Sequence, residues 1–430
     1  MKTTTLIFGC CIINSLTFAN DDLALQSAVP VAALKTKPDS SADLPPVLVI
    51  DDAISAAMGN HPALRAIEAA VQRQQHLVYQ ATRGPNPVVG YMASEVGNDG
   101  DFGQQGVFLN QEIVRGCKLG LDGRIQQREV EVQRQRLLLQ RMQIEARIRT
   151  AYLKVAYYQE QLRLQITLQK SLDSAVKAVR SLVESGELGT SALLQSSLES
   201  QRNQMLTRRS ETQLNAARSA LAALIGWQSL DVEVDVTALQ PNDPATFTNQ
   251  WESISASSPE INVAVARQSL AQAKVERQQA EPIPNLQTQW SLQQDAATEH
   301  TVFGIQLGVE LPIRDANNGA IKAARADTWR THHEIEAIRR SLKQRFAVVA
   351  GQIQQADQQL SIIRDELQTL AQKNLDSTQR AFRLGEASYV DLLNAQRAYI
   401  SLRQETLTLY QQRAIAASHL STQLVGVVDR

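Results

Sequence analysis

The sequence lacks the patterns that mark most enzymes, nucleic-acid-binding proteins and helical membrane proteins. After the N-terminal 19 residues, no segment has the roughly 20 consecutive apolar residues that a transmembrane helix requires. It has no Gly-rich phosphate loop, nucleophile elbow or zinc-protease helix, so it predicts no catalytic site and no cofactor. The 43 Lys and Arg residues nearly balance the 44 Asp and Glu residues, which predicts no general affinity for nucleic acid.

The N-terminal segment is typical of a secretory signal. Lys2 precedes an apolar run, Leu6–Phe18, and the small residue Ala19 follows it. We expect residues 1–19 to be a signal peptide that is removed after Ala19. Lipidation of Cys10 is the alternative interpretation of the same segment.

Cysteine and aromatic residues are scarce in the rest of the chain. Cleavage after Ala19 would leave Cys117 as the single cysteine, which excludes an internal disulfide. Residues 20–46 contain four prolines among Ser and Asp, and they are predicted to be an exported linker without a core. Aromatic residues make up 5% of the chain, while Gln, Ala, Leu and Arg are abundant, a composition typical of long helices.

A first helix is predicted from roughly Asp52 to Thr82, and two longer helical patterns follow it. A helix from about Leu119 to Glu184 would be roughly 100 Å long at 1.5 Å per residue. Apolar residues at heptad spacing from Phe346 to Leu370 predict an uninterrupted packing seam. The polar residues Gln165, Gln169 and Asn374 are predicted to weaken these seams near the helix ends.

Four short segments alternate between apolar and polar residues, as strands with two different faces do. They are predicted at about 87–97, 105–114, 285–294 and 302–312. Alternation alone favours a soluble sheet with one buried face, although membrane-spanning strands show the same alternation. Four strands cannot close a barrel, so a membrane location would require several chains to share one barrel.

The sequence contains an internal duplication, in which corresponding residues lie about 198 positions apart. Glu112 corresponds to Glu310, and Gly186 corresponds to Gly385. This duplication predicts a first repeat at 47–226, an inter-repeat segment at 227–258 and a second repeat at 259–430. A pseudo-symmetric architecture made of two halves is therefore expected.

These features together resemble the outer-membrane efflux proteins of the TolC type. The resemblance covers about residues 47–428, and it includes Val49–Ile54, Asn60–Pro62 and the stretch Leu384–Gln396. It implies a mainly α-helical fold with membrane β-strands. Three chains would form a 12-stranded β-barrel, four strands from each, on an α-helical periplasmic tunnel. The implied partners are two further copies, a periplasmic adaptor protein, an inner-membrane pump and outer-membrane lipid.

The resemblance also implies a gate at the periplasmic tip. Asp391 matches the first pore-facing acidic residue of the family, and Asn394 stands where a second is often found. Phe382 and Ala387 occupy the places of a Tyr and an Arg that lock the tip in some members, so any lock must be built differently. Asp391 lies three residues after Ser388, and a helix-capping carboxylate is the alternative role.

Glycines mark the two reversals between long helices. Gly186, Gly189 and Gly385 are predicted to be the hinges of the tip, because glycine adopts the left-handed conformation that follows a helix. Glu112 and Glu310 lie on the polar face of the second strand in each repeat. They are predicted to face a wet lumen, although a solvated position without a special role fits them as well.

A second function class fits part of these observations. An exported coiled-coil scaffold without a barrel would explain the heptads and the missing active site, but not the proline-bracketed strands. The adjacent His332 and His333 point in different directions on a helix, so a solvated pair is favoured over a metal site. The sequence leaves the cargo of a duct open among metal ions, drugs and polypeptides.

Overall fold

The computed structural model of the protein describes residues 47–97, 103–240, 251–296 and 298–424. All of them belong to one compact unit, Pro45–Arg430. The predicted signal peptide and linker lie outside the described residues. Within the described ranges, no helix combines the length and the apolar character needed to cross a membrane.

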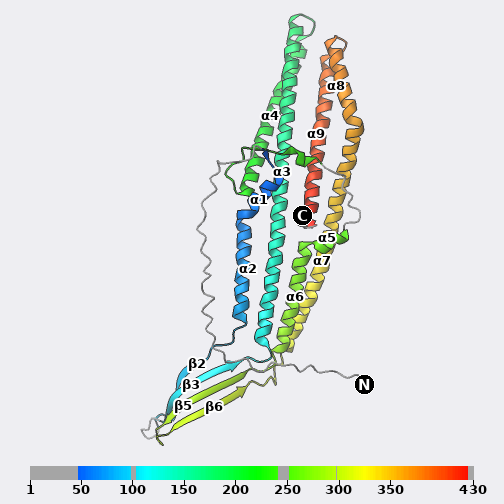
Figure 1. The fold of residues 1–430 in the computed structure, drawn as a ribbon. Helices are drawn as coiled ribbons and strands as arrows, with labels where there is room; N and C mark the ends of the chain where they lie inside the picture. The colour runs from blue at the N-terminus through cyan, green and yellow to red at the C-terminus, as the bar shows by residue number, and fades with distance from the viewer. Residues whose placement is uncertain (1–46, 98–102, 241–250, 297, 425–430) are drawn as a thin grey trace, which may run out of the picture. The chain divides into compact units, whose positions relative to one another are not determined.

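Four strands form one antiparallel sheet in the order β2-β3-β5-β6 (Figure 1). Their bounds are Val88–Ser94 for β2, Gln104–Ile113 for β3, Leu286–Asp295 for β5 and Thr301–Val309 for β6. The central pair β3–β5 joins the two repeats, with Leu109 opposite Trp290. In the described part of the chain, β2 and β6 are the edge strands.

The first helical segment differs from the sequence prediction. We expected one helix from Asp52 to Thr82, and the structure has two, α1 (Ile50–Asn60) and α2 (Pro62–Ala81). Pro62 disfavours helical backbone at the preceding residue, and His61 is extended at φ −65° and ψ 121°. The Nδ1 atom of His61 accepts a hydrogen bond from the Ala63 N–H at 3.2 Å, so the break is also an N-cap.

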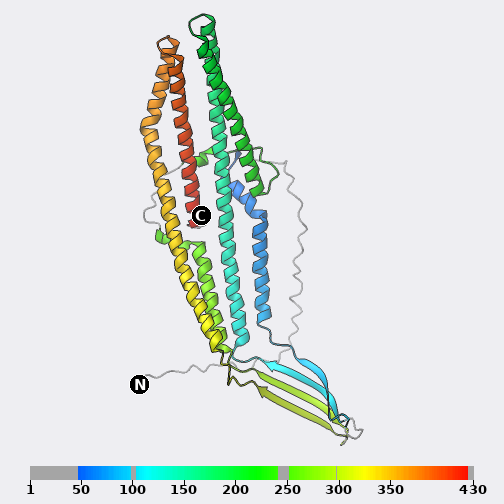
Figure 2. The same ribbon diagram turned by 180° about the vertical axis from the view of Figure 1, so that it is seen from behind.

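The long helices carry the rest of the fold. Their bounds are Lys118–Glu184 for α3, Thr190–Ile225 for α4, Pro259–Ala280 for α6, Asn318–Ile362 for α7, Gln368–Arg383 for α8 and Tyr389–His419 for α9. Helix α3 packs against α2 and α4, and also against α6 and α9 (Figures 1 and 2). The order of neighbours is α2-α3-α6-α7 beside the sheet and α4-α3-α9-α8 at the hairpins. The first of these orders repeats the order of the strands.

The seam of the second repeat is interrupted, contrary to the prediction. A π-helical turn, η2 (Ile363–Leu367), separates α7 from α8. Ile363 is buried, but Leu367 and Leu370 are 41% and 62% exposed, and Leu375 is buried instead. A π-turn accommodates one extra residue, so every later position moves by one place in the seam. Asn374, predicted to lie in the seam, is exposed for this reason.

Part of the segment between the repeats packs against the middle of α3, together with the short strand at the start of the first repeat. Short strands β1 (Val47–Leu48) and β4 (Glu233–Val234) pair in parallel, followed by η1 (Val236–Leu239); α5 (Trp251–Ser257) precedes α6. The Tyr152 hydroxyl donates to the Leu48 carbonyl at 2.8 Å and accepts from the Asp235 N–H at 2.9 Å. Burial of this hydroxyl raises the pKa of Tyr152 to about 12. The pair β1–β4 is thereby fixed to the helices by a buried side chain.

Candidate functional site

The two hairpin turns have matching backbone geometry. Gly186 and Gly385 follow their helices in the left-handed conformation, at φ 81° and 79°. The Glu187 N–H donates to the Leu182 carbonyl at 2.9 Å, and the Glu386 N–H donates to the Ala381 carbonyl at 2.8 Å. Each of these bonds closes the last turn of its helix, so the reversals are ordered by their own backbones.

The third predicted hinge glycine has a different role. Gly189 is extended, at φ −76° and ψ 154°, and it is the N-cap of α4. Its backbone is one that other residues also adopt, so the left-handed conformation predicted for it is wrong. In the second hairpin, Ser388 is the N-cap, and its hydroxyl accepts from the Asp391 N–H at 3.2 Å.

Asp391 is part of a complete capping box. Its Oδ2 atom accepts from the Ser388 hydroxyl at 2.7 Å and from the Ser388 N–H at 3.1 Å. These two bonds to the Ser388 hydroxyl and backbone lower the pKa of Asp391 below its ordinary value. The carboxyl group therefore stays ionised at neutral pH and steadies the start of α9.

Asp391 and Asn394 share one exposed face of α9. The neighbouring Leu392, Leu393 and Ala395 are buried, as is Gln396. Because positions three apart lie on the same side of a helix, both polar side chains point away from the helices of this chain. This arrangement leaves them accessible to water or to another subunit, and the capping box already occupies one of them.

The two hairpins contact each other close to their turns. Five buried residues form a cluster between them: Leu172, Ala175, Val179, Tyr389 and Leu393. The rings of Phe382 and Tyr389 meet edge to face with centroids 6.3 Å apart. Burial, reinforced by nearby Glu199, raises the pKa of Tyr389 above its ordinary value. Phe382 therefore packs inside the hairpin contact.

An ion pair joins the hairpins beside this cluster. The Arg397 guanidinium donates two hydrogen bonds to the Glu199 carboxylate, from Nε to Oε1 at 3.2 Å and from Nη2 to Oε2 at 2.5 Å. Hydrogen bonding to Glu199 raises the pKa of Arg397, and the Glu199 side chain is 18% exposed. This pair was not predicted, because residues on two helices so far apart in the chain show no spacing signal. The acidic Glu199 among Ser and Gln residues of α4 was the only hint.

The core of the first hairpin is polar at a level farther from the turn. The Asn203 Nδ2 donates to the Gln169 Oε1 at 2.8 Å and to the Gln165 carbonyl at 3.3 Å. Gln165 and Asn203 are both buried, and the Gln165 Oε1 and Asn203 Oδ1 atoms have no hydrogen-bond partner among the described residues. Buried polar atoms without partners cost free energy, so this part of the hairpin is held weakly.

One face of the sheet is apolar and exposed. The strand register places aliphatic and aromatic side chains in rows that cross all four strands. One row is Val89, Leu109, Trp290 and Ile305, and the next is Tyr91, Val107, Leu292 and Phe303. Ile305, Phe303 and Val89 are 60%, 63% and 73% exposed. No helix in the described part of the chain covers this face.

The two predicted lumen carboxylates lie in different settings. Glu112 is near the end of β3, and its Oε1 atom accepts from Asn285 Nδ2 at 2.7 Å. The same Asn285 accepts from Lys118 Nζ at 3.2 Å. Glu310 lies one residue beyond the end of β6 and is exposed. The structure thus gives Glu112 a position in a polar network and leaves Glu310 solvated.

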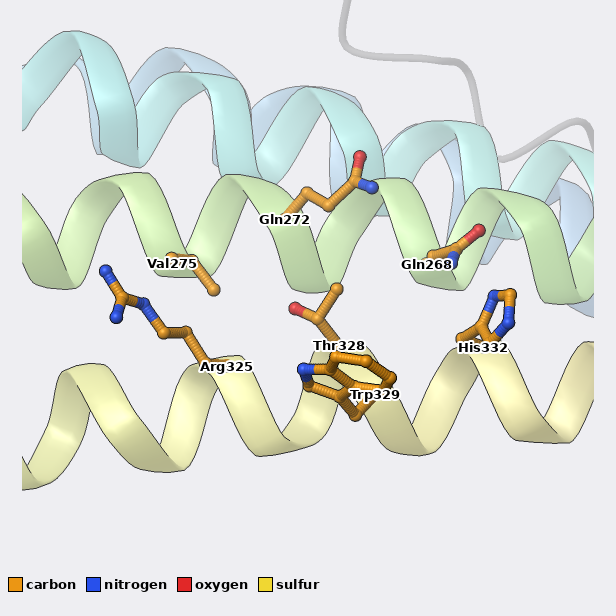
Figure 3. Close-up of a pocket in the computed structure, with 7 residues that line it drawn as sticks. All are labelled: Gln268, Gln272, Val275, Arg325, Thr328, Trp329 and His332. Carbon is orange, nitrogen blue, oxygen red and sulfur yellow. The ribbon is translucent and has the colours of Figure 1, made fainter.

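A shallow hollow of about 470 Å³ lies between α6 and α7 (Figure 3). Its lining is Gln268, Gln272 and Val275 from α6, with Arg325, Thr328, Trp329 and His332 from α7. Trp329 is 67% exposed, and the polar side chains in Figure 3 do not converge on one point. Among the described residues, no group of three His, Cys, Asp or Glu side chains is arranged to hold a metal ion. The hollow therefore lacks the geometry of an active site.

The helical hairpins and the sheet with its exposed apolar face define a class of fold found in outer-membrane channels. A solved structure of CusC matches with a TM-score of 0.74 at 16% identity, over 88% of this chain and 92% of that one. The outer membrane protein VceC of Vibrio cholerae matches with a TM-score of 0.70 at 17% identity, over 88% and 96% of the chains.

The sequence comparisons point to the same kind of protein. Residues 252–426 match the family described as outer membrane efflux protein, in agreement with the family resemblance that the motifs predicted. The cobalt-zinc-cadmium resistance protein CzcC of Cupriavidus metallidurans is 24% identical over 381 residues, which cover 86% of this chain and 88% of that protein. This family consists of outer-membrane efflux channels rather than enzymes, which agrees with the outer-membrane location that the sequence predicts.

Proposed function

We propose that this chain is one subunit of a passive outer-membrane duct through which an efflux or secretion system exports its cargo. The observation that carries the proposal is the exposed apolar face of the sheet. Soluble proteins rarely expose an apolar area of this kind, whereas a membrane strand presents one to lipid. From Val107 to Ile113 the face is about 20 Å high at roughly 3.3 Å per residue, close to the apolar band of a barrel.

The edge strands require further copies of the chain. An open sheet edge cannot lie in lipid, because its N–H and C=O groups would have no partners there. Strand β6 of one copy would pair with β2 of the next, and three copies would give a closed barrel of 12 strands. The helices support the same closure, because α2 and α7 end the helix order as β2 and β6 end the strand order.

The helices would form the periplasmic part of the duct. Helix α3 has 67 residues, which span about 100 Å at 1.5 Å per residue. A length of this order suits a tube across an aqueous compartment. A periplasmic adaptor and an inner-membrane pump would bind at the hairpin end and supply energy and substrate choice, since the duct itself is passive.

The gate would lie at the hairpin turns. Three copies of Asp391 around a narrow axis would repel one another and attract cations, and Asn394 would line the same face. The contact that holds the hairpins together within a chain is the Arg397–Glu199 pair with the cluster around Tyr389. Opening would separate this contact, while Gly186, Gly189 and Gly385 stay as pivots at the turns.

The resemblance to a cobalt-zinc-cadmium resistance protein favours metal cations among the possible cargoes. A wide aqueous tube with carboxylates at its narrowest level suits hydrated cations. Deletion of the gene should then lower the concentrations of cobalt, zinc or cadmium that stop growth. A strain that loses resistance only to detergents or drugs would exclude this cargo and leave the duct intact.

Two measurements test the duct itself. The protein should stay in the membrane fraction after washes with high salt and urea, and it should require detergent for extraction. The purified protein should give discrete conductance steps in planar bilayers, and Asp391→Asn should reduce its preference for cations. A chain that urea releases from the membrane and that gives no conductance in bilayers would instead be an exported coiled-coil scaffold.

A further inference from the structure

Four leucines near the hairpin turns are exposed, two on α4 and two where η2 continues into α8. Leu194 and Leu198 on α4 are 72% and 68% exposed, and Leu367 and Leu370, at the end of η2 and in α8, are 41% and 62% exposed. Helices α4 and α8 are the two ends of the neighbour order α4-α3-α9-α8. The exposed leucines therefore lie on the two free edges of the hairpin layer.

The contact between the hairpins inside one chain shows what such positions do when a neighbour is present. Leu393 on α9 is 7% exposed and lies in one cluster with partly buried Leu168. The next turn of α9 places Gln396 Nε2 3.4 Å from the Ser171 hydroxyl of α3, where it donates a hydrogen bond. One residue later, Arg397 binds Glu199.

The duplication relates this contact to the exposed leucines. Beyond η2 the repeats correspond with an offset of 199 residues, as the matching turn glycines Gly186 and Gly385 show. With this offset, each exposed leucine takes the place of a contact residue: Leu194 of Leu393, Leu198 of Arg397, Leu367 of Leu168 and Leu370 of Ser171. The positions are equivalent, but in this chain no second hairpin covers them.

The π-turn is what brings two of these leucines to the surface. If the helix were a regular α-helix at this point, Leu367 and Leu370 would continue the heptad seam that includes Ile363. Because the π-turn accommodates one extra residue, Ala371 and Leu375 enter the seam instead, and the two leucines turn outward. A residue that is exposed only because of a local irregularity of the helix suggests a use for that exposure.

We propose that Leu194 and Leu198 of one copy pack against Leu367 and Leu370 of the next copy, as an apolar repeat of the contact inside the chain. This inference rests on the proposed ring, because closure of β6 on β2 of the next copy also brings α8 beside that copy's α4. The contact inside the chain contains the Arg397–Glu199 ion pair. Between copies, Leu198 and Ala398 take those two positions. High salt should therefore weaken the contact within a chain and leave the contact between copies unchanged.

Cross-linking of the full-length protein tests the proposed contact. In a Cys117→Ser background, Ser197→Cys and Leu370→Cys are combined, since these positions correspond to Gln396 and Ser171. The detergent-extracted protein is treated with a short bismaleimide and separated under denaturing conditions. The pair Ser171→Cys with Gln396→Cys calibrates the reach of the reagent, and Gln195→Cys with Leu370→Cys is the matched control.

The expected result is covalent dimers and trimers from Ser197 and Leu370, at least about tenfold more abundant than from the control. The calibration pair should give a link within a single chain. Intact trimers by native mass spectrometry, without these interchain links, would overturn the proposed contact and leave the ring standing. Single chains by native mass spectrometry would overturn the ring as well.

Discussion

The hairpin α3–α4 and the hairpin α8–α9 end in the same turn, yet their cores are of opposite kinds. The first has buried Gln165, Asn203 and Ser210, and the second has Ile363, Leu402 and Leu409 at the corresponding positions. The first has an uninterrupted α-helix in α3, and the second has the π-turn η2. The two duplicated hairpins have thus kept the same turn geometry but differ in the side chains that hold their helices together.

This difference assigns separate roles to the two hairpins. The apolar second hairpin is the more rigid, because each of its seam residues gains free energy by burial. The first hairpin buries polar atoms without partners and is the easier to separate. We therefore expect opening of the tip to begin in α3–α4, with α8–α9 as the fixed side.

The largest expected effect comes from deleting one residue in each hairpin. Deletion of Thr167 rotates the rest of α3 by about 100° relative to its partners and should cost about 5 kcal/mol in the free energy of unfolding. Deletion of Glu366 removes the extra residue of η2 and should leave the buried seam in place. Thermal unfolding followed by circular dichroism compares the two. Equal losses of stability would show that η2 is not the site of the insertion.

The next effect tests the apolar core directly. Leu402→Asn gives the second hairpin the residue of the first and should lower the free energy of unfolding by about 3 kcal/mol, because an amide replaces a packed apolar side chain. Leu402→Met is the matched control and should cost less than about 1.5 kcal/mol. Denaturant unfolding in detergent measures both. If Leu402→Asn does not lower the free energy of unfolding, the hairpin α8–α9 is not the more rigid of the two.

The reverse exchange should have a smaller effect of opposite sign. Gln165→Ile together with Asn203→Leu removes two buried oxygen atoms without partners and should stabilise the first hairpin by about 2 kcal/mol. Conductance in bilayers should fall, since the easier opening route becomes harder. Asn203→Leu alone leaves Gln165 unsatisfied and serves as the control. Unchanged conductance in the double variant would mean that opening does not begin in this hairpin.

The ion pair between the hairpins should contribute about 1 kcal/mol, because Arg397 is half exposed and solvent screens the pair. Arg397→Leu copies Leu198, its counterpart, and should raise the open fraction of the channel about fivefold. High salt should raise the open fraction of the unmodified channel and change the variant little. Arg403→Leu on the same helix is the control. Salt effects of equal size in both proteins would exclude the pair as a latch.

The smallest effect concerns Asp391 and pH. Its bonds to Ser388 lower the pKa in the folded state, so its contribution to stability is present above the ordinary carboxyl pKa and is lost as pH falls through the lowered value. At neutral pH, where this contribution is present, Asp391→Asn should therefore lower stability slightly, and it should have a larger effect on cation preference. Titration of the carboxyl carbon by NMR checks the pKa. A value at or above that of an unfolded chain would contradict the capping geometry.

The sequence predicted much of the architecture, because its signals were periodic. Alternation marked the strands, prolines after α2 and α6 marked the ends of those helices, and turn glycines marked the reversals. The break at His61–Pro62 was missed because the apolar pattern continues through it. The π-turn was missed for a similar reason. The heptad spacing from Phe346 to Leu370 continues without a break in the sequence, although the π-turn shifts which residues after Ile363 face the partner helix.

The site was harder to predict than the fold. Ser388 and Asp391 are three residues apart, so their capping box was visible in the sequence. The Arg397–Glu199 pair and the cluster around Tyr389 depend on how α9 packs against α3 and α4. A single sequence carries no signal for such a long-range contact, except through the comparison of one repeat with the other.

Native mass spectrometry of the protein extracted from outer membranes tests the central claim most directly. The claim is that one chain cannot cover its apolar sheet face or its strand edges by itself. We expect an assembly of three chains that keeps detergent or lipid bound until it is activated in the gas phase. A single chain that stays folded and dispersed in buffer without detergent would contradict it.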